Sequence, residues 1–267
     1  MTRKRSPILA WVVLIIAALY MLVPLYATFE FSLHAKRNQL TLIAYTNVLQ
    51  SSDFSDSFMF SLRSALLIIV VSAALVVPTI YWVRLKLPGM RPIIEFFTLL
   101  PLVIPPVVLA FGLIRAFNQV RINDSLLTDS REGTYVLLLG AYLMLALPFM
   151  YRTVDSGMQT INVRVLTEAA QSLGAGWFTI LFRIIFPNVI VAVLNGAFIT
   201  FAIVMGEFTI ANLLSQPAFG PYMYQLNSNK VYEPSAVAVI SFGLTWLCII
   251  LIESLGRRGN SARVTVR

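Results

Sequence analysis

Long apolar runs separated by short polar segments dominate the pattern of this chain. A helix needs about 20 apolar residues to cross the hydrocarbon core of a bilayer, where each backbone polar group must find its partner within the same segment. About six runs pass this test, which predicts an all-α, polytopic membrane helical bundle. The predicted spans run near Ile8 to Phe29, Leu62 to Val83, Ile93 to Phe117, Tyr135 to Tyr151, Val189 to Leu214 and Val237 to Ile252.

Composition supports a chain that is solvated by lipid. Hydrophobic residues make up 58% and charged residues 12% of the sequence, whereas charged residues average about 25% in soluble domains. The first run follows the basic residues 3–5, as a secretory signal would, but it exceeds the signal core of about 7 to 15 residues, and no small-x-small cleavage site follows it. We interpret this run as a retained first span, and residues 1–267 as a single transmembrane domain without internal repeats.

The distribution of lysine and arginine predicts the orientation, because basic residues near span ends are retained on the cytoplasmic side. With the N-terminus inside, the cytoplasmic side collects Arg3, Lys4, Arg5, Arg84, Lys86, Arg91, Arg152, Arg164, Arg183, Arg257, Arg258, Arg263 and Arg267. The opposite side collects Lys36, Arg37, Arg115, Arg121, Arg131 and Lys230. Both termini and the loop at 162–187 are therefore expected in the cytoplasm. Because the net charge of +8 lies on no continuous face, we expect no nucleic-acid partner.

The loop at 162–187 carries the signals of a short helix. Asn162 is a plausible N-cap, since its side-chain oxygen can accept a backbone N–H of the first turn. Gly174 can end the helix in the left-handed conformation. Between them, the small side chains of Ala169 and Ala170 would allow another protein to approach closely, and Glu168 offers a charge to a basic or N–H-bearing rim. These features predict a helix that docks on a partner.

A second amphipathic helix follows the first. Trp177, Ile180, Leu181 and Ile184 recur at i, i+3, i+4 and i+7, so we expect them to pack against the membrane bundle. Pro187 should then allow a turn into the fifth span, because proline is tolerated in the first turn of a helix. The alternative interpretation of the whole loop is an ordinary amphipathic connector.

The spacing of residues within the loop is more specific than its composition. Glu168-Ala-Ala is followed by three residues, Gly174, nine residues and then Ile184-x-Phe186-Pro187. This pattern resembles the cytoplasmic signature of the integral-membrane permease subunits of binding-protein-dependent ABC importers, in which leucine stands in place of Phe186. Phenylalanine keeps an apolar packing role at that position.

The third span adds to the resemblance. Its proline-rich sequence, with Pro101, Pro105 and Pro106, is similar to the third span of the spermidine/putrescine, ferric iron and phosphonate branch of these permeases. The resemblance covers residues 62–253, the expected permease core. Proline removes a helix hydrogen bond and kinks or loosens the span, so these residues are expected to form either a bending gate or a static kink.

The resemblance implies a type I ABC importer permease fold in a bacterial or archaeal cytoplasmic membrane. It also implies cytoplasmic ABC ATPase subunits docked on the loop at 162–187, a second permease subunit, identical or different, and an extracytoplasmic substrate-binding protein. The chain lacks a Gly-rich Lys-Ser/Thr phosphate loop, so ATP hydrolysis is expected on a separate subunit. We expect no cofactor and no metal, because His34 is the sole histidine and Cys248 the sole cysteine.

Four ionisable residues are expected at membrane depth: Glu95, Arg115, Glu207 and Glu253. Glu95, Arg115 and Glu253 lie near span ends, where snorkelling explains them, so Glu207 is the best candidate for a solute path. Glu207 lies in the predicted fifth span, and a charge in hydrocarbon should face the protein interior or water. We expect Gly206, Glu207 and Phe208, with Asn195, to line a substrate path. The alternative is that Glu207 makes a helix-to-helix hydrogen bond or an ion pair with Arg115. A carboxylate in the path favours a cationic solute such as a polyamine; ferric iron, a phosphonate or another small solute are alternatives.

Two other classes of function fit less well. A secondary transporter usually carries two related halves, and the sequence shows none. An integral membrane enzyme would need convergent nucleophiles, acids or metal ligands, and the sequence offers no carboxylate cluster and no cysteine pair.

Overall fold

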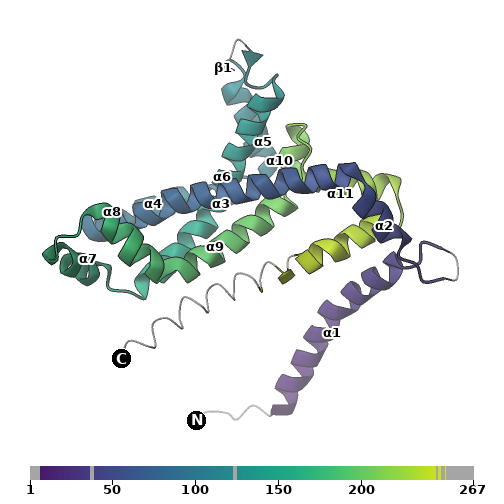
Figure 1. Ribbon diagram of the computed structural model, residues 1–267, viewed down its shortest axis with the longest axis horizontal. Coiled ribbons are helices and arrows are strands. Elements are labelled where there is room, and N and C mark those ends of the chain that lie inside the picture. The colour runs from purple at the N-terminus through teal and green to yellow at the C-terminus, as the bar shows by residue number, and fades with distance from the viewer. Residues whose placement is uncertain (1–6, 37–38, 123–124, 245, 248–249, 251–267) are drawn as a thin grey trace. The chain divides into compact units, whose positions relative to one another are not determined.

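The computed structural model describes residues 7–36, 39–122, 125–244, 246–247 and 250. Its regular structure is helical apart from one short antiparallel hairpin (Figure 1). The elements are α1 (Pro7–Ser32), α2 (Ile43–Gln50), α3 (Ser52–Lys86), η1 (Pro88–Met90), α4 (Arg91–Leu99), η2 (Leu100–Leu102), α5 (Pro106–Phe117), β1 (Arg121–Ile122), β2 (Ser125–Leu126), α6 (Arg131–Gln159), α7 (Val163–Ser172), α8 (Trp177–Thr179), η3 (Ile180–Ile185), α9 (Phe186–Gly206), α10 (Thr209–Leu213) and α11 (Phe219–Asn229). The turns η1 and η2 are 3₁₀-helical, and η3 is π-helical.

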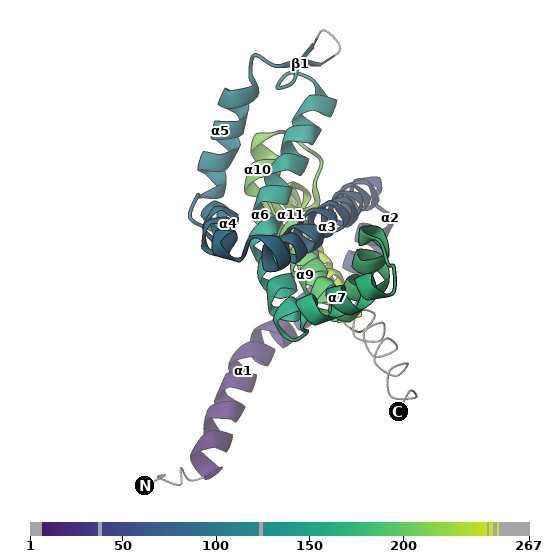
Figure 2. The same cartoon turned by 90° about the vertical axis from the view of Figure 1, so that its left-hand side faces the viewer.

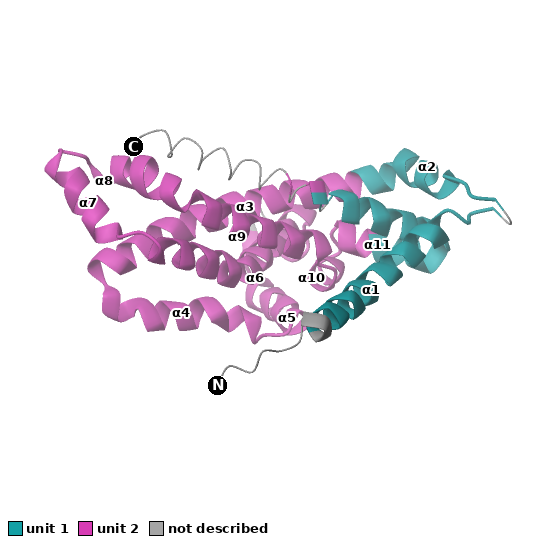
Figure 3. Cartoon of the chain, turned by 90° about the horizontal axis from the view of Figure 1, so that it is seen from below, with its two compact units in different colours: residues 1–55, 223–246 teal, residues 56–222, 247–267 magenta. Residues whose placement is uncertain are grey.

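The chain divides into two compact units, which Figure 3 colours separately. Unit 1 comprises residues 1–55 and 223–246, and unit 2 comprises residues 56–222 and 247–267. Unit 2 contains the loop at 162–187 and most of the predicted spans.

Unit 1 contains α1, α2 and a short apolar helix, Glu233–Leu244. Asn47 of α2 donates a hydrogen bond to Oε1 of Glu233 at 3.2 Å, and the ring centroids of Phe31 and Tyr232 lie 5.0 Å apart. In the most apolar window of α1, 0% of the residues are buried within the chain. The apolar surface of α1 is therefore suited to lipid or to another subunit.

Unit 2 is built on the close packing of α6 against α9. A Cβ atom placed on Gly157 of α6 would lie 2.4 Å from Cβ of Ala192 on α9. On α9, a Cβ atom placed on Gly196 would lie 2.5 Å from Oγ1 of Thr153. Small residues let two helix backbones approach closely, which is how helices associate where no hydrophobic effect drives them together.

The third span is broken at its prolines, as the sequence predicted. The helical segments Pro88–Leu102 and Pro106–Phe117 meet at an angle of 100°. Pro105 precedes α5 in an extended conformation and Pro106 opens that helix, where its missing N–H costs nothing. Beyond the break, α5 lies beside α6 and α10 (Figure 2). Whether this break acts as a gate stays a prediction.

Among the residues that the structure describes, length and composition identify four helices that can cross a membrane, or five with the bent pair counted as one span. The four are Ala10–Ser32, Ser52–Lys86, Arg131–Gln159 and Trp177–Gly206. The fourth predicted span, Tyr135–Tyr151, is the central part of the 29-residue helix α6. The sequence prediction missed both ends of this helix because they are polar. Ser130 caps its N-terminus by accepting the N–H of Gly133 at 3.0 Å. The sixth predicted span begins in Glu233–Leu244, and its end at 251–252 lies outside the described residues.

Candidate functional site

The helix α7 is closed at both ends as the sequence predicted. The side chain of Asn162 accepts a backbone N–H of the first turn at 3.2 Å. Gly174 has a φ of 79°, its N–H donates to the carbonyl of Gln171 at 2.9 Å, and the N–H of Ala175 donates to the carbonyl of Ala170 at 3.0 Å. This pair of bonds is the Schellman motif, which satisfies the last carbonyls of a helix. The first part of the loop is thus a helix whose two ends are both hydrogen-bonded.

Helical periodicity divides α7 into a buried face and an exposed face. Val163, Thr167 and Ala170 recur at i, i+4 and i+7 and are buried in unit 2. Glu168 and Ala169 are exposed. The sequence expectation that both alanines face a partner is therefore corrected at one position: Ala170 is only 6% exposed and packs into the core of its own chain. Its small side chain brings α7 close to the bundle.

The exposed face of α7 carries a charge and an apolar side chain. Glu168 lies 3.6 Å from Arg164, one turn earlier, and both side chains are exposed. An exposed pair of this kind contributes less than about 1 kcal/mol, so Glu168 is available to another protein. Leu173, immediately before the capping glycine, is 89% exposed. Leu173 was not among the predicted site residues, although an apolar residue next to a helix-ending glycine in a polar loop was a usable signal.

The second amphipathic helix packs as predicted, but it does not turn before the fifth span. Ile180 and Leu181 are buried, and the rings of Trp177 and Trp82 have centroids 6.3 Å apart. The helix continues through the π-helical turn η3 into α9 without a loop. Pro187 lies in the first turn of α9, where its missing N–H is tolerated. The expected turn at Pro187 is therefore a widened helical turn inside one continuous helix.

A buried hydrogen bond ties α7 to α3. The hydroxyl oxygens of Tyr81 and Thr167 lie 3.3 Å apart. Thr167 Oγ1 donates its one proton to the carbonyl of Val163 at 2.7 Å, so Tyr81 is the donor to Thr167. Displacement of α7 is thereby linked to the end of α3.

A carboxylate that sequence reasoning missed lies beside this contact. Asp155 of α6 is 8% exposed. Its Oδ1 accepts hydrogen bonds from Nε of Arg84 at 3.1 Å and from Nη2 of the same residue at 2.5 Å. Its Oδ2 accepts from Nη2 of Arg91 at 2.7 Å and from Nε2 of Gln159 at 2.9 Å. In the sequence analysis, Arg84 and Arg91 served only to assign orientation.

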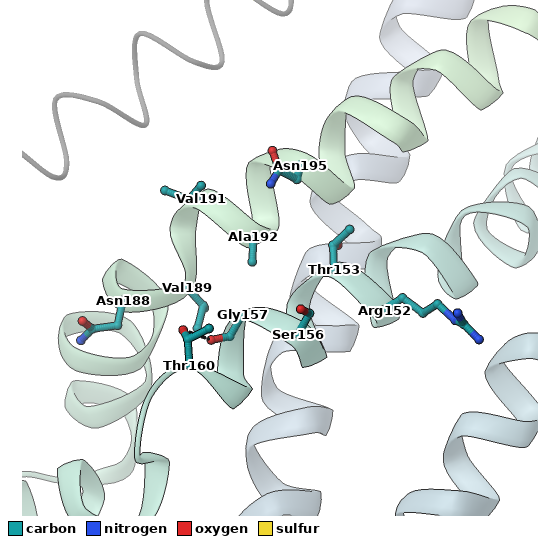
Figure 4. Close-up of a pocket in the computed structure, with 10 residues that line it drawn as sticks. All are labelled: Arg152, Thr153, Ser156, Gly157, Thr160, Asn188, Val189, Val191, Ala192 and Asn195. Atoms are coloured by element: carbon teal, nitrogen blue, oxygen red, sulfur yellow. Dashed lines mark hydrogen bonds between the residues drawn. The ribbon is translucent and has the colours of Figure 1, made fainter. Parts of the chain in front are cut away.

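A groove runs between α6 and α9 in the half of unit 2 that carries α7 (Figure 4). Its volume is about 470 Å³, and it is lined by Arg152, Thr153, Ser156, Gly157, Thr160, Asn188, Val189, Val191, Ala192 and Asn195. Asn195, a predicted path residue, is among them, whereas Gly206, Glu207 and Phe208 are not. The lining mixes polar side chains with Val189, Val191 and Ala192, and it contains one guanidinium and no carboxylate; Arg152 extends away from Asn195 (Figure 4).

Glu207 differs from its predicted setting. The helix α9 ends at Gly206, and the two oxygens of the Glu207 carboxylate accept the backbone N–H groups of Ile210 at 2.7 Å and Ala211 at 3.0 Å. The acid therefore caps α10, which a carboxylate at a helix N-terminus stabilises. Within the described part of the chain, no ion pair joins Glu207 to Arg115.

The glycine expected to admit a second helix is also placed differently. A Cβ atom on Gly206 would meet no atom within 4 Å, whereas one on Gly220 would lie 2.3 Å from the backbone oxygen of Glu207. The close approach at this break is therefore made by Gly220, and the position of Gly206 leaves open space.

Comparison with known proteins decides the family. Residues 88–260 match the family described as "Binding-protein-dependent transport system inner membrane component". The chain belongs to this family. Its membrane bundle is thus that of an inner-membrane permease.

Individual relatives of this chain are distant in sequence. The chain is 27% identical over 186 residues to the spermidine/putrescine transport system permease protein PotC of Escherichia coli K12, and the match covers 65% of each chain. It is 28% identical over 189 residues to the molybdenum transport system permease protein ModB of the same strain, covering 66% of this chain and 81% of the relative. The match to PotC thus spans less than two thirds of the length of either protein.

A solved structure shares the fold of the permease. A chain of a bacterial alginate ABC transporter, in complex with a periplasmic protein that carries an alginate pentasaccharide, superposes with a TM-score of 0.70. Sequence identity is 16%, and the match covers 94% of both chains. At this identity the likeness establishes the fold alone.

Proposed function

We propose that this permease is the membrane subunit of an ABC importer, in which α7 docks on a cytoplasmic ATPase subunit and transmits its movement to the spans. The observation that carries the proposal is the construction of α7. The helix is capped at both ends, buried along one face and hydrogen-bonded to α3, yet it exposes Glu168, Ala169 and Leu173. Because α7 is bonded to the bundle on its buried face and exposes the apolar Leu173 to a partner, movement of the partner would displace α7 and the helices bonded to it.

The ATPase subunits supply the energy, and the permease alternates between an inward-open and an outward-open conformation. Closure of the ATPase subunits on ATP would move α7 and shift the spans between these two conformations. An external binding protein delivers the solute. In this proposal the end of unit 2 that carries α7 faces the cytoplasm, as the distribution of lysine and arginine predicts.

The groove between α6 and α9 is the proposed solute path on that side. Its lining carries hydroxyl, amide and guanidinium groups, and a second permease subunit would close these groups off from lipid. Asn195 and Asn188 from α9 and Ser156 from α6 would meet the solute there. Gly206 would leave room for a solute further along α9.

A polyamine is the first candidate solute. The support is the similarity to PotC and the acidic Glu207 at the break after α9. A carboxylate oxygen has more than one acceptor position, so an ammonium group could share Glu207 with the backbone of α10.

A small oxyanion is the second candidate solute, and the groove itself favours it. Its lining has the guanidinium of Arg152, hydroxyls and amides, but no carboxylate. Such groups donate hydrogen bonds to oxyanions and give a polycation no counter-charge. The similarity to ModB agrees with this alternative.

One experiment tests the function, and a second selects the solute. The tagged permease should co-purify with an ATPase subunit. With Cys248 replaced by alanine, a cysteine at Gln171 should react with a membrane-impermeant maleimide only from the cytoplasmic side. Reaction from outside the cell would overturn the proposal.

For the solute, the purified complex and its binding protein in proteoliposomes should take up labelled spermidine in an ATP-dependent manner. Uptake of molybdate instead would select the oxyanion. Uptake of either solute without an ATPase subunit would point to a secondary transporter.

A further inference from the structure

Three helices meet at the carboxylate of Asp155. Arg84 belongs to the last turn of α3, Arg91 opens α4, and Asp155 itself lies one turn before the end of α6. Arg84 occupies one carboxylate oxygen and also donates to the backbone carbonyl of Asp155 at 3.1 Å, while Arg91 shares the other oxygen with Gln159. The two arginines make charge-assisted hydrogen bonds to the carboxylate, and Gln159 belongs to the same helix as Asp155. Hydrogen bonds between ionised groups are stronger than those between neutral groups.

The same end of α3 is also bonded to α7. Tyr81 donates its hydrogen bond to Thr167 of α7, and Arg84 lies three residues further along α3, on the adjacent part of the same face. One turn of α3 is therefore bonded both to α7 and to Asp155.

Beyond Asp155 the chain of contacts reaches the broken third span. Arg91 is the first residue of α4, and α4 continues through η2 to the 100° break before α5. The bond between Arg91 and Asp155 thus lies at the start of the helical segment that leads to the proline-rich break.

We propose that Asp155 is the positioning residue through which displacement of α7 reaches the break in the third span. This inference rests on the proposed coupling role of α7. Asp155 holds the end of α3 and the start of α4 in one fixed relation, so that the two move together when α7 moves. Packed elements joined by directional bonds to a buried carboxylate transmit displacement, whereas the exposed pair of Arg164 and Glu168 could not.

The test uses the assembled complex of permease and ATPase, in the background Cys248→Ala. A reporter cysteine replaces Val103, which lies at the break and is exposed. The measurement is its rate of reaction with a maleimide, in the nucleotide-free complex and after trapping with MgATP and vanadate. In the parent, trapping should change this rate by about threefold or more, the size expected of coupling between linked sites.

Asp155→Asn keeps the shape of the side chain and removes its charge. We expect the reporter rate to become independent of trapping, while the amount of bound ATPase stays within about twofold of the parent. Glu132→Gln makes the same change of charge at the other end of α6, in an exposed side chain, and should leave the response intact. Arg91→Gln cuts the link to α4 alone and keeps the pair of Arg84 and Asp155; it should act like Asp155→Asn even if the latter folds poorly. Arg91→Lys should restore part of the response.

The outcomes separate the inference from the function on which it rests. If the parent binds no ATPase and shows no response to trapping, the proposed function fails. If the parent responds and both Asp155→Asn and Arg91→Gln respond equally, only the role of Asp155 is overturned. Loss of bound ATPase with an unchanged response would also overturn it, because a merely structural joint predicts that result.

Discussion

Tyr81 of α3 and Thr167 of α7 are 86 residues apart in sequence and share a buried hydrogen bond of 3.3 Å. The bond is directional, because the proton of Thr167 is committed to the carbonyl of Val163. Tyr81→Phe should keep the packing and cost about 1 kcal/mol of stability. Thermal unfolding of the purified permease checks this change, with Tyr26→Phe, at a tyrosine that is 70% exposed, as the control. An equal loss in both variants would contradict a specific contribution of the bond.

Leu173 tests the free face of α7. Leu173→Asp should reduce the amount of co-purified ATPase by about tenfold or more, since losing a hot-spot residue at the centre of an interface costs about 2 kcal/mol or more. Ser172→Asp adds the same charge at the neighbouring exposed position and should have a smaller effect. Equal binding by the Leu173 variant and the parent would move the docking surface elsewhere.

Gly174 tests the end of the same helix. Its φ of 79° is strained for any residue with a Cβ, and proline cannot adopt it at all. Gly174→Pro should therefore abolish ATP-dependent uptake while the protein remains inserted, and Gly174→Ala should show an intermediate loss. Gly176 has an ordinary φ of −77°, so Gly176→Ala is the matched control. Full uptake by Gly174→Pro would remove the coupling role from this loop.

Glu207 tests the break after α9. Glu207→Gln retains one acceptor oxygen and presents an NH₂ group to one of the two backbone N–H groups that the carboxylate now accepts. We expect altered uptake kinetics with normal ATPase binding, because the change lies far along α9 from α7. Unchanged kinetics would confine Glu207 to capping α10.

The contact between α6 and α9 gives a test of stability. Gly196→Ala would place Cβ 2.5 Å from Oγ1 of Thr153 and 2.7 Å from the sulfur of Met150, so the helices must separate or repack. Overpacking of this kind costs about 1 to 3 kcal/mol. Gly140→Ala on α6 meets nothing within 4 Å and should be neutral. Thermal unfolding in detergent distinguishes the two, and equal midpoints would show that the contact is looser than the geometry indicates.

Local features of this permease were predictable from local signals. The caps at Asn162 and Gly174 follow from side-chain chemistry and backbone freedom, and the break at Pro105 follows from missing N–H groups. These effects act within one helical turn, so the neighbouring residues suffice to foresee them.

Features set by distant contacts were not predictable. Asp155 finds its partners 71 and 64 residues earlier in the chain, and nothing near it in sequence names them. The end of α9 at Gly206 was hidden because the residues after it are as apolar as a span. The burial of Ala170 depends on which face of α7 the bundle covers, and a short helix with small residues on both faces does not reveal this.

The π-helical turn η3 determines in which direction the side chains of α9 point around the helix axis. Its bond from the N–H of Phe186 to the carbonyl of Leu181 spans five residues where an α-helix spans four. The turn therefore accommodates one residue more than an α-helical turn would, and a helix advances by about 100° per residue. Without that additional residue, the side of α9 bearing Asn188 and Asn195 would be rotated by about this angle with respect to Ile180 and Leu181. The widened turn of six residues thus directs the polar side of α9 toward α6, while Ile180 and Leu181 stay packed in the core.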